Sequence, residues 1–142
     1  MIIAFARHGE TDLNEQKRMT GRTDVDLNQK GLRQAIEMRA SLQSVYDVLF
    51  SSSLKRSMQT AVVINEKLLI PLFVDDSILE RHFGSLAGKT WNEINTELGF
   101  DARNADKEQR YDYRPFGGES AEQVRERLAA FIERVKAGHH KK

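Results

Sequence analysis

The sequence of 142 residues predicts a single α/β domain in which helices cover a mainly parallel sheet. Three observations support this prediction. An apolar run near the N-terminus has the composition of a strand that is buried on both faces. Two further short apolar runs alternate with stretches of helical periodicity. The length fits one domain, residues 1–142, with its own core, and we find neither a repeat nor a linker that divides it.

The first strand is expected at residues 2–6, Ile-Ile-Ala-Phe-Ala, and a long polar loop is expected at 8–27. Asn28 can cap a helix that continues to about Ser44. The spacing of the apolar residues predicts that the inner face of this helix carries Leu32, Ala35, Ile36 and Leu42.

A second strand is expected in "DVLFSSS" (47–53) and a third in "PLFVDD" (71–76). A helix is expected between them at 54–68, because apolar residues recur there at helical spacing. Its inward-facing residues are predicted to be Met58, Ala61, Val62 and Leu68.

Two later helices have start signals of the capping-box type, at Thr90–Glu93 and at Ser120–Gln123. Residues 99–118 between them are expected to form a charged loop. The last helix, 120–136, has a continuous apolar face and should be a crossover that leads into another parallel strand. The sequence contains no apolar run after it. The apolar face consists of Ala121, Val124, Leu128, Phe131, Ile132 and Val135.

Composition excludes several classes of function. The 22 basic and 21 acidic residues give a net charge of +1, which provides no general attraction to nucleic acid or to a membrane surface. The chain has no cysteine, so disulfides, thiolate zinc sites and thiol nucleophiles are excluded. No apolar run is long enough to span a bilayer or to act as a signal peptide, and the expected location is the cytoplasm.

Charged residues follow each of the three expected strands: Arg7 and His8, then Arg56, then Glu80 and Arg81. Ligands of open α/β sheets bind outside the carboxyl ends of the strands. Arginine forks can hold phosphoryl oxygens, a neutral histidine can attack phosphorus, and a carboxylic acid can protonate the leaving oxygen. This combination favours a site for a phosphate monoester.

Each cluster taken alone has an ordinary interpretation, as a polar turn, a solvated helix residue or a surface ion pair. Their joint placement after successive strands favours the catalytic interpretation. The histidines at 8, 82, 139 and 140 lack the spacing of metal ligands, so no catalytic metal is expected. The candidate residues also require no organic cofactor.

The segment "ARHGET" resembles the signature of the histidine phosphatase superfamily, which includes the cofactor-dependent phosphoglycerate mutases. Four other segments resemble that family in the same order: "TDLNEQKRMTGRTDVDLNQKGLRQA", "LFSSSLKRSMQTA", "LERHFGSLAGKTWNEI" and "FGGES". The resemblance covers essentially the whole chain. It implies a three-layer α/β/α fold of the phosphoglycerate mutase type.

The resemblance also implies roles for individual residues. His8 would be phosphorylated during turnover, Arg7 and Arg56 would hold the transferring phosphoryl group, and Glu80 would be the general acid or base. Four further residues match positions that line the substrate pocket in the family: Asn14, Thr20, Gly21 and Arg81.

The sequence departs from the family at its C-terminal end. The family has a second histidine, in an "SHG" motif after a central strand that follows the last helix found here. His139 and His140 are interpreted as a polar tail. Three explanations are open: a naturally short product, a truncated or proteolysed piece, and a partner chain, such as the second copy in a homodimer, that fills the gap. We favour truncation, so weak or absent activity is expected.

The expected activity is that of a phosphomonoesterase on a small phosphorylated metabolite. The 20-residue stretch 99–118 is shorter than the insertion that shields the mutase site from water, which favours hydrolysis. Arg81 resembles the mutase pattern, so a cofactor-dependent phosphoglycerate mutase is the alternative. "YRPFGGES" is similar to phosphatases of cobalamin nucleotide-loop synthesis. A non-catalytic phosphate-binding module is the third hypothesis.

Overall fold

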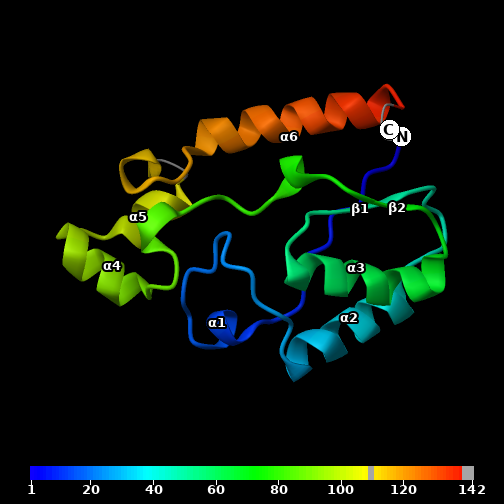
Figure 1. Cartoon of the computed structure of the whole chain (residues 1–142), viewed down its shortest axis with the longest axis horizontal. Coiled ribbons are helices and arrows are strands. Elements are labelled where there is room, and N and C mark those ends of the chain that lie inside the picture. Colours follow the sequence, from blue (N-terminus) through cyan, green and yellow to red (C-terminus); the bar gives the residue numbers. More distant parts are fainter. Residues whose placement is uncertain (109–110, 139–142) are drawn as a thin grey trace. The chain divides into compact units, whose positions relative to one another are not determined.

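The computed structural model describes residues 1–108 and 111–138, and it divides into two compact units that are considered separately below (Figure 1). That the chain behaves as a single domain stays a prediction. The first unit contains Met1–Asp12, Asp24–Leu79 and the end of the chain from Phe131. The second contains Leu13–Thr23 and Glu80–Ala130.

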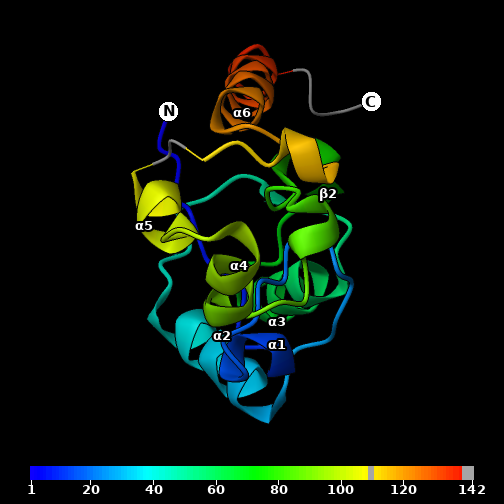
Figure 2. The ribbon, with the colours of Figure 1, turned by 90° about the vertical axis from the view of Figure 1, so that its left-hand side faces the viewer.

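The first unit is built on a β–α–β motif, as the sequence predicted. Strands β1 (Leu49–Ser51) and β2 (Leu72–Val74) pair in parallel, with Phe50 opposite Phe73. Helix α3 (Lys55–Leu68) connects them, and helix α2 (Gln29–Ser41) lies beside α3 in both views (Figures 1 and 2). The short turn η1 (Asp76–Ile78) follows β2. The alternation of strands and helices confirms the α/β class.

Residues 2–6 do not form the predicted strand. The side chains of Ile2 and Phe5 are 78% and 84% exposed, and residues 2–6 make no backbone hydrogen bond with any residue that the structure describes. The physical reason is the lack of a neighbour. An apolar run of this kind is stable as a strand when hydrogen-bonded strands flank it, and β1 pairs here with β2.

Helix α2 begins where its cap predicts, because Asn28 Oδ1 accepts a hydrogen bond of 2.8 Å from the Gly31 N–H. It ends at Ser41, three residues earlier than expected. The prediction of its inner face was correct for Ala35, which is buried, but wrong for Leu32 and Ile36, which are 46% and 41% exposed. The buried residues of α2, Gly31 and Ala35, are small. At Gly31 the backbone of residues 9–10 approaches the helix too closely for a larger side chain.

Helix α3 begins one residue later than predicted and ends at Leu68 as predicted, but it buries a different row of side chains. Arg56, Thr60 and Ile64, four residues apart, lie on its buried face together with Ala61. Val62 was predicted to point inward and is 51% exposed, so that prediction was wrong.

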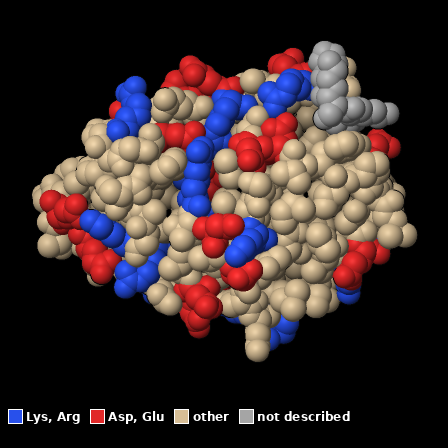
Figure 3. All heavy atoms as spheres, in the orientation of Figure 1, with Lys and Arg blue, Asp and Glu red and all other residues tan. Residues whose placement is uncertain are grey.

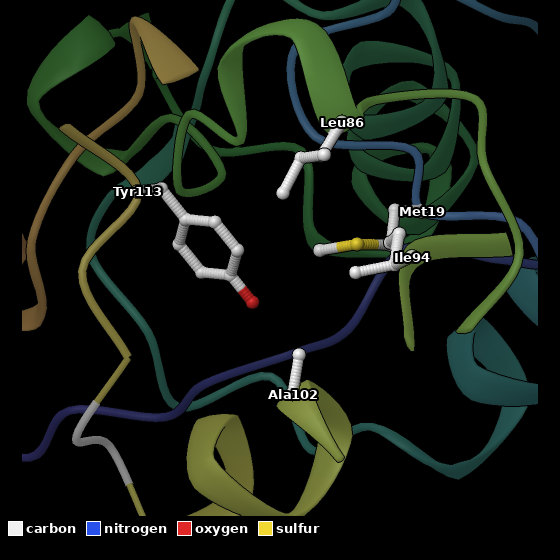
Figure 4. Close-up of a cluster of buried hydrophobic side chains, with 5 residues drawn as sticks. All are labelled: Met19, Leu86, Ile94, Ala102 and Tyr113. Carbon is white, nitrogen blue, oxygen red and sulfur yellow. The ribbon is translucent and has the colours of Figure 1, made fainter. Parts of the chain in front are cut away.

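The second unit has its own hydrophobic core, built from segments far apart in the sequence (Figure 4). Its helices are α4 (Trp91–Leu98) and α5 (Ala102–Lys107), with the short turns η2 (Gly84–Leu86) and η3 (Arg114–Phe116). Helix α1 (Asp12–Glu15) is a single turn. The capping box predicted for α4 is present. The buried residues of the core are Met19, Leu86, Ile94, Ala102 and Tyr113.

The predicted charged loop at 99–118 contains α5 and a core residue. Tyr113 is fully buried, its hydroxyl donates a 2.7 Å hydrogen bond to Asp106 Oδ1, and its ring packs edge-on against Phe83 and Tyr111. This burial raises the pKa of Tyr113. The aromatic residues therefore order a segment that its charge pattern assigned to a loop.

Helix α6 (Ala121–Lys136) begins with the predicted capping box, in which Ser120 and Gln123 exchange hydrogen bonds of 3.0 and 3.2 Å. In the part of the chain that the structure describes, no helix is long and apolar enough to cross a membrane. Basic and acidic side chains are interspersed on the face shown in Figure 3, in line with the small net charge.

A carboxylate organises the charged part of the second unit. Glu119 pairs with Arg127 at 3.0 Å and with Arg22 at 3.2 Å, and it accepts a 2.9 Å hydrogen bond from the His82 N–H. Burial alone would raise the pKa of the Glu119 carboxyl, but these donors outweigh it and hold the pKa below the ordinary value.

Replacing a core residue tests the packing of the second unit. Ile94→Ala should lower the free energy of unfolding by about 2–5 kcal/mol, because it leaves a cavity at a fully buried position. Urea denaturation of the full chain measures this change. Asn92→Ala, at an exposed position on the same helix, should change it by less than about 0.5 kcal/mol. Equal effects of the two variants would contradict the assigned core.

Replacing Glu119 tests the charge network. Glu119→Gln should cost about 1–3 kcal/mol of stability at pH 7, since two guanidinium groups lose their anionic partner. A carboxyl whose folded pKa is depressed stabilises the protein above its unfolded pKa of about 4.3 and loses this effect as the pH falls through the folded pKa. The difference between the two proteins should therefore shrink below about pH 4.

Urea denaturation at several pH values measures that difference. Glu122→Gln, which removes an exposed carboxylate nearby, should change stability little at any pH. A Glu119→Gln penalty that stays constant from pH 7 to pH 3 would assign the loss to packing instead of charge.

Candidate active site

His8 is held in one orientation by a backbone acceptor and a buried cation. Its Nδ1 lies 2.7 Å from the Gly9 carbonyl oxygen, and its Nε2 lies 3.2 Å from Arg56 Nε. Because the guanidinium can only donate, Nε2 is the acceptor, and Nδ1–H donates to Gly9. This assigns the tautomer that a phosphoryl-accepting imidazole needs, with the lone pair on Nε2.

Arg56 reaches His8 from the first turn of α3 and is 1% exposed. One turn later, the Thr60 hydroxyl donates to the Arg56 carbonyl at 2.8 Å and accepts from the Gly9 N–H at 3.2 Å. Thr60 thus ties the loop after His8 to the helix that carries Arg56. We did not predict this residue from the sequence, although its i+4 spacing from Arg56 was the available signal.

The loop after His8 is also fastened to the start of α2. A methyl group on Gly9 would lie 2.2 Å from the Gly31 carbonyl oxygen, so only glycine allows this backbone approach. Glu10 accepts hydrogen bonds from Lys30 at 2.9 Å and Asn28 at 3.2 Å, which hold the pKa of its carboxyl below the ordinary value. These contacts position the residues on the C-terminal side of His8.

Arg7, the remaining predicted phosphate ligand of this unit, has an exposed side chain. It makes neither a hydrogen bond nor an ion pair with the residues of ranges 1–108 and 111–138. The structure therefore brings His8 and Arg56 together, whereas Arg7, the sequence neighbour of His8, makes no polar side-chain contact with the described residues.

Glu80, the predicted acid, is exposed and belongs to the second unit. Its Oε1 accepts a 2.8 Å hydrogen bond from the Arg81 N–H. Its carbonyl oxygen accepts from Arg22 Nε and Arg127 Nη2, each at 3.4 Å. Since Glu119 pairs with both arginines, this network fixes the backbone at Glu80, and we did not predict it from the sequence.

Arg81 is engaged within the second unit. Its guanidinium donates to Asp106 Oδ1 at 3.2 Å, to the Glu119 carbonyl at 3.1 Å and to the Tyr111 carbonyl, and it lies 4.4 Å from the centre of the Tyr113 ring. These contacts hold the segment after Glu80 against the aromatic core.

The other predicted pocket residues also lie in the second unit. Asn14 Nδ2 is 3.4 Å from the Thr20 hydroxyl. Gly21 has a positive φ of 53°, which favours glycine, and a side chain there would meet the Phe83 ring. Asn14, Thr20 and Gly21 thus shape one turn close in sequence to Arg22.

The described residues, 1–108 and 111–138, contain no group of three His, Asp or Glu side chains placed to hold a metal ion. The first unit provides an imidazole with a fixed tautomer beside a permanent cation. A guanidinium at this position can bind phosphoryl oxygens and stabilise the charge that develops during transfer.

The chain matches the model of the histidine phosphatase superfamily (branch 1) over residues 3–142. It is 36% identical over 104 residues to a 2,3-bisphosphoglycerate-dependent phosphoglycerate mutase of Nautilia profundicola, which covers 68% of this chain and 45% of that protein. It is 39% identical over 92 residues to an uncharacterised phosphatase, PhoE, of Bacillus subtilis, covering 64% and 48%. The chain thus spans about half the length of these curated relatives.

Solved structures show the same relationship. A mycobacterial glucosyl-3-phosphoglycerate phosphatase in complex with VO3 superposes with a TM-score of 0.80 and 32% identity, covering 93% of this chain and 63% of that one. Bacillus stearothermophilus YhfR gives a TM-score of 0.80 and 29% identity, covering 95% and 67%. These neighbours confirm the phosphoglycerate mutase-like fold, and with the match over residues 3–142 they establish that this chain belongs to the histidine phosphatase superfamily.

Proposed function

We propose that this protein is a phosphomonoesterase that acts through a phosphohistidine intermediate at His8, with weak or no activity in the 142-residue form. The observation that carries the proposal is the orientation of His8, whose Nδ1–H donates to Gly9 while Nε2 faces the buried Arg56. The names of two similar proteins, a glucosyl-3-phosphoglycerate phosphatase and an uncharacterised phosphatase, support this class of reaction.

In the proposed first step, His8 Nε2 attacks phosphorus and forms a P–N bond while the ester P–O bond breaks. Glu80 in its acid form donates a proton to the leaving oxygen. In the second step, water attacks phosphorus, the P–N bond breaks, and inorganic phosphate leaves. Arg56 and Arg7 would hold the phosphoryl oxygens through both steps, and Asn14, Thr20, Gly21 and Arg81 are the proposed substrate-binding residues.

A cofactor-dependent phosphoglycerate mutase is the second candidate, because one of the similar curated proteins has that name. The resemblance of Arg81 to the mutase pattern was the sequence signal for it. Against it stands the 20-residue stretch 99–118, which is shorter than the insertion that shields the mutase site from water. We therefore favour hydrolysis, with a small phosphorylated metabolite as substrate and the cytoplasm as location. A non-catalytic phosphate-binding module is the third candidate.

Hydrolysis of p-nitrophenyl phosphate by the purified 142-residue chain tests the proposal. We expect turnover about 10²–10³-fold below that of an intact phosphatase of the family, because one phosphoryl-stabilising group of the family pattern is absent. His8→Ala should abolish the remainder, whereas Arg33→Ala, at an exposed position of α2, should not.

Three outcomes would contradict parts of this proposal. Turnover equal to that of an intact relative would contradict the weak activity of this form. Turnover that survives His8→Ala would contradict the phosphohistidine intermediate. Binding of inorganic phosphate without turnover would favour the non-catalytic module.

Anion binding tests Arg56 without relying on turnover. Arg56→Lys should weaken the binding of vanadate by about tenfold or more, because lysine cannot offer the planar forked donor. Calorimetric titration measures the affinity, and circular dichroism checks that the variant is folded. Arg33→Lys on α2 is the matched control and should bind as the parent does. Unchanged affinity in Arg56→Lys would remove Arg56 from the phosphate site.

A further inference from the structure

The side chain of Gln34 reaches the loop after His8 from helix α2. Its Oε1 accepts a 2.8 Å hydrogen bond from the Glu10 N–H. This N–H belongs to the same peptide group as the Gly9 carbonyl, whose oxygen accepts the Nδ1–H of His8 at 2.7 Å. A single peptide group therefore connects Gln34 with the imidazole.

The geometry of that peptide group couples its two hydrogen bonds. The bond between Gly9 and Glu10 is trans, and in a planar trans peptide the N–H and the C=O point in opposite directions. An acceptor that holds the N–H therefore also sets the direction of the C=O. Gln34 Oε1, on one side of the loop, keeps the Gly9 carbonyl directed toward His8 on the other side.

The backbone at Gly9 needs such a restraint, because glycine has the widest choice of backbone angles. Thr60 holds the preceding peptide group by accepting from the Gly9 N–H at 3.2 Å. The Asn28 N–H holds the following one by donating to the Glu10 carbonyl at 3.0 Å. The peptide group between them can still turn about its own axis, and Gln34 opposes this rotation by holding its N–H.

The sequence of α2 brings Gln34 to the loop. A methyl group on Gly31 would lie 2.1 Å from the Glu10 carbonyl oxygen and 2.6 Å from the Glu10 nitrogen, so the backbone of Glu10 lies directly against this turn of the helix. Gln34 follows three residues later and shares the same face. The glycine permits the close approach, and the glutamine supplies the acceptor.

We propose that Gln34 is a positioning residue, which acts through the peptide group between Gly9 and Glu10 to keep the Nδ1–H of His8 hydrogen-bonded while Nε2 bonds to phosphorus. This inference rests on the proposed function of His8. It gives Gln34 no contact with the substrate.

The reaction makes this restraint more important than it is at rest. In the structure, Arg56 Nε donates to Nε2 and thereby also favours the tautomer with the proton on Nδ1. During transfer, the lone pair of Nε2 forms the P–N bond and can no longer accept this hydrogen bond. The Gly9 carbonyl still accepts from Nδ1–H, and the bond becomes charge-assisted because the ring gains a positive charge when Nε2 bonds to phosphorus.

The size of the effect follows from the exposure of Gln34. The residue is exposed, so water can also accept a hydrogen bond from the Glu10 N–H. A water molecule satisfies this donor but does not fix its direction. We therefore expect the loss of the Gln34 acceptor to cost about three- to tenfold in the function of His8, which is the net value of one hydrogen bond.

Proton NMR of the full chain tests the positioning role without turnover. The hydrogen-bonded Nδ1–H of His8 should give a downfield imidazole resonance, assigned by its loss in His8→Ala. Gln34→Met removes the acceptor oxygen and should speed exchange of this proton with water about threefold or more. Gln34→Glu retains an acceptor oxygen and should behave as the parent does. The three side chains have similar helix propensities, so α2 itself is preserved.

The matched control is Gln29→Met, at an exposed position at the start of the same helix. It should leave the resonance unchanged. Circular dichroism checks that every variant is folded.

Anion binding tests the effect on the reacting nitrogen. Vanadate accepts a fifth ligand and so imitates the transition state in which Nε2 bonds to phosphorus, whereas inorganic phosphate binds without that bond. In calorimetric titrations, Gln34→Met should weaken vanadate binding about three- to tenfold and phosphate binding less than about twofold. Gln34→Glu and Gln29→Met should bind both anions as the parent does.

Several results would overturn the role of Gln34. These are a parent without the Nδ1–H resonance, a resonance that is unchanged in Gln34→Met, equal losses of vanadate and phosphate affinity, and a Gln34→Glu variant that behaves like Gln34→Met. Failure of the proposed function has a different signature. Vanadate would then bind to His8→Ala as tightly as to the parent, whatever the resonance of the Gln34 variants shows.

Discussion

A buried guanidinium must be hydrogen-bonded, and the way in which Arg56 meets this requirement determines the geometry of the first unit. Its side chain is 1% exposed, and its Nε donates to the imidazole of His8. This contact fixes which nitrogen of His8 carries the proton. Thr60 provides a second link between the same two segments, because its hydroxyl donates to the Arg56 carbonyl and accepts from the Gly9 N–H. Strand β1 and helix α3 therefore position the guanidinium of Arg56, and this guanidinium orients the imidazole of His8.

The loop that carries His8 is held from one side only. On its C-terminal side, the contact between Gly9 and Gly31 and the hydrogen bonds of Glu10 to Asn28 and Lys30 fasten it to α2. On its N-terminal side, residues 2–6 have no hydrogen bonds to the described residues. Contacts with α2 and α3 therefore define the orientation of the imidazole, whereas the sequence pattern predicted that a strand at residues 2–6 would position it.

Local structure was more predictable from the sequence than packing was. The roles of His8, Arg56 and Glu80 stay predictions that rest on the family resemblance and on charged residues after successive expected strands, and the structure adds that His8 and Arg56 are in contact. The predicted β–α–β alternation and both capping boxes were confirmed, because these depend on local sequence. The exposure of Val62 could not be predicted, because the inner face of a helix depends on which elements pack against it. Ordering of the segment around Tyr113 likewise depends on distant aromatic partners.

The error at residues 2–6 has a different origin from the others. The composition of that run predicts a strand with apolar neighbours on both faces, whereas Phe5 is 84% exposed in the structure. Burial of a side chain of this size stabilises a protein by about 1.5–3 kcal/mol, so exposure of several of them is a substantial loss for a single domain. The apolar pattern predicts hydrogen-bonded neighbours on both sides of residues 2–6, and the described residues supply no such neighbour to this run.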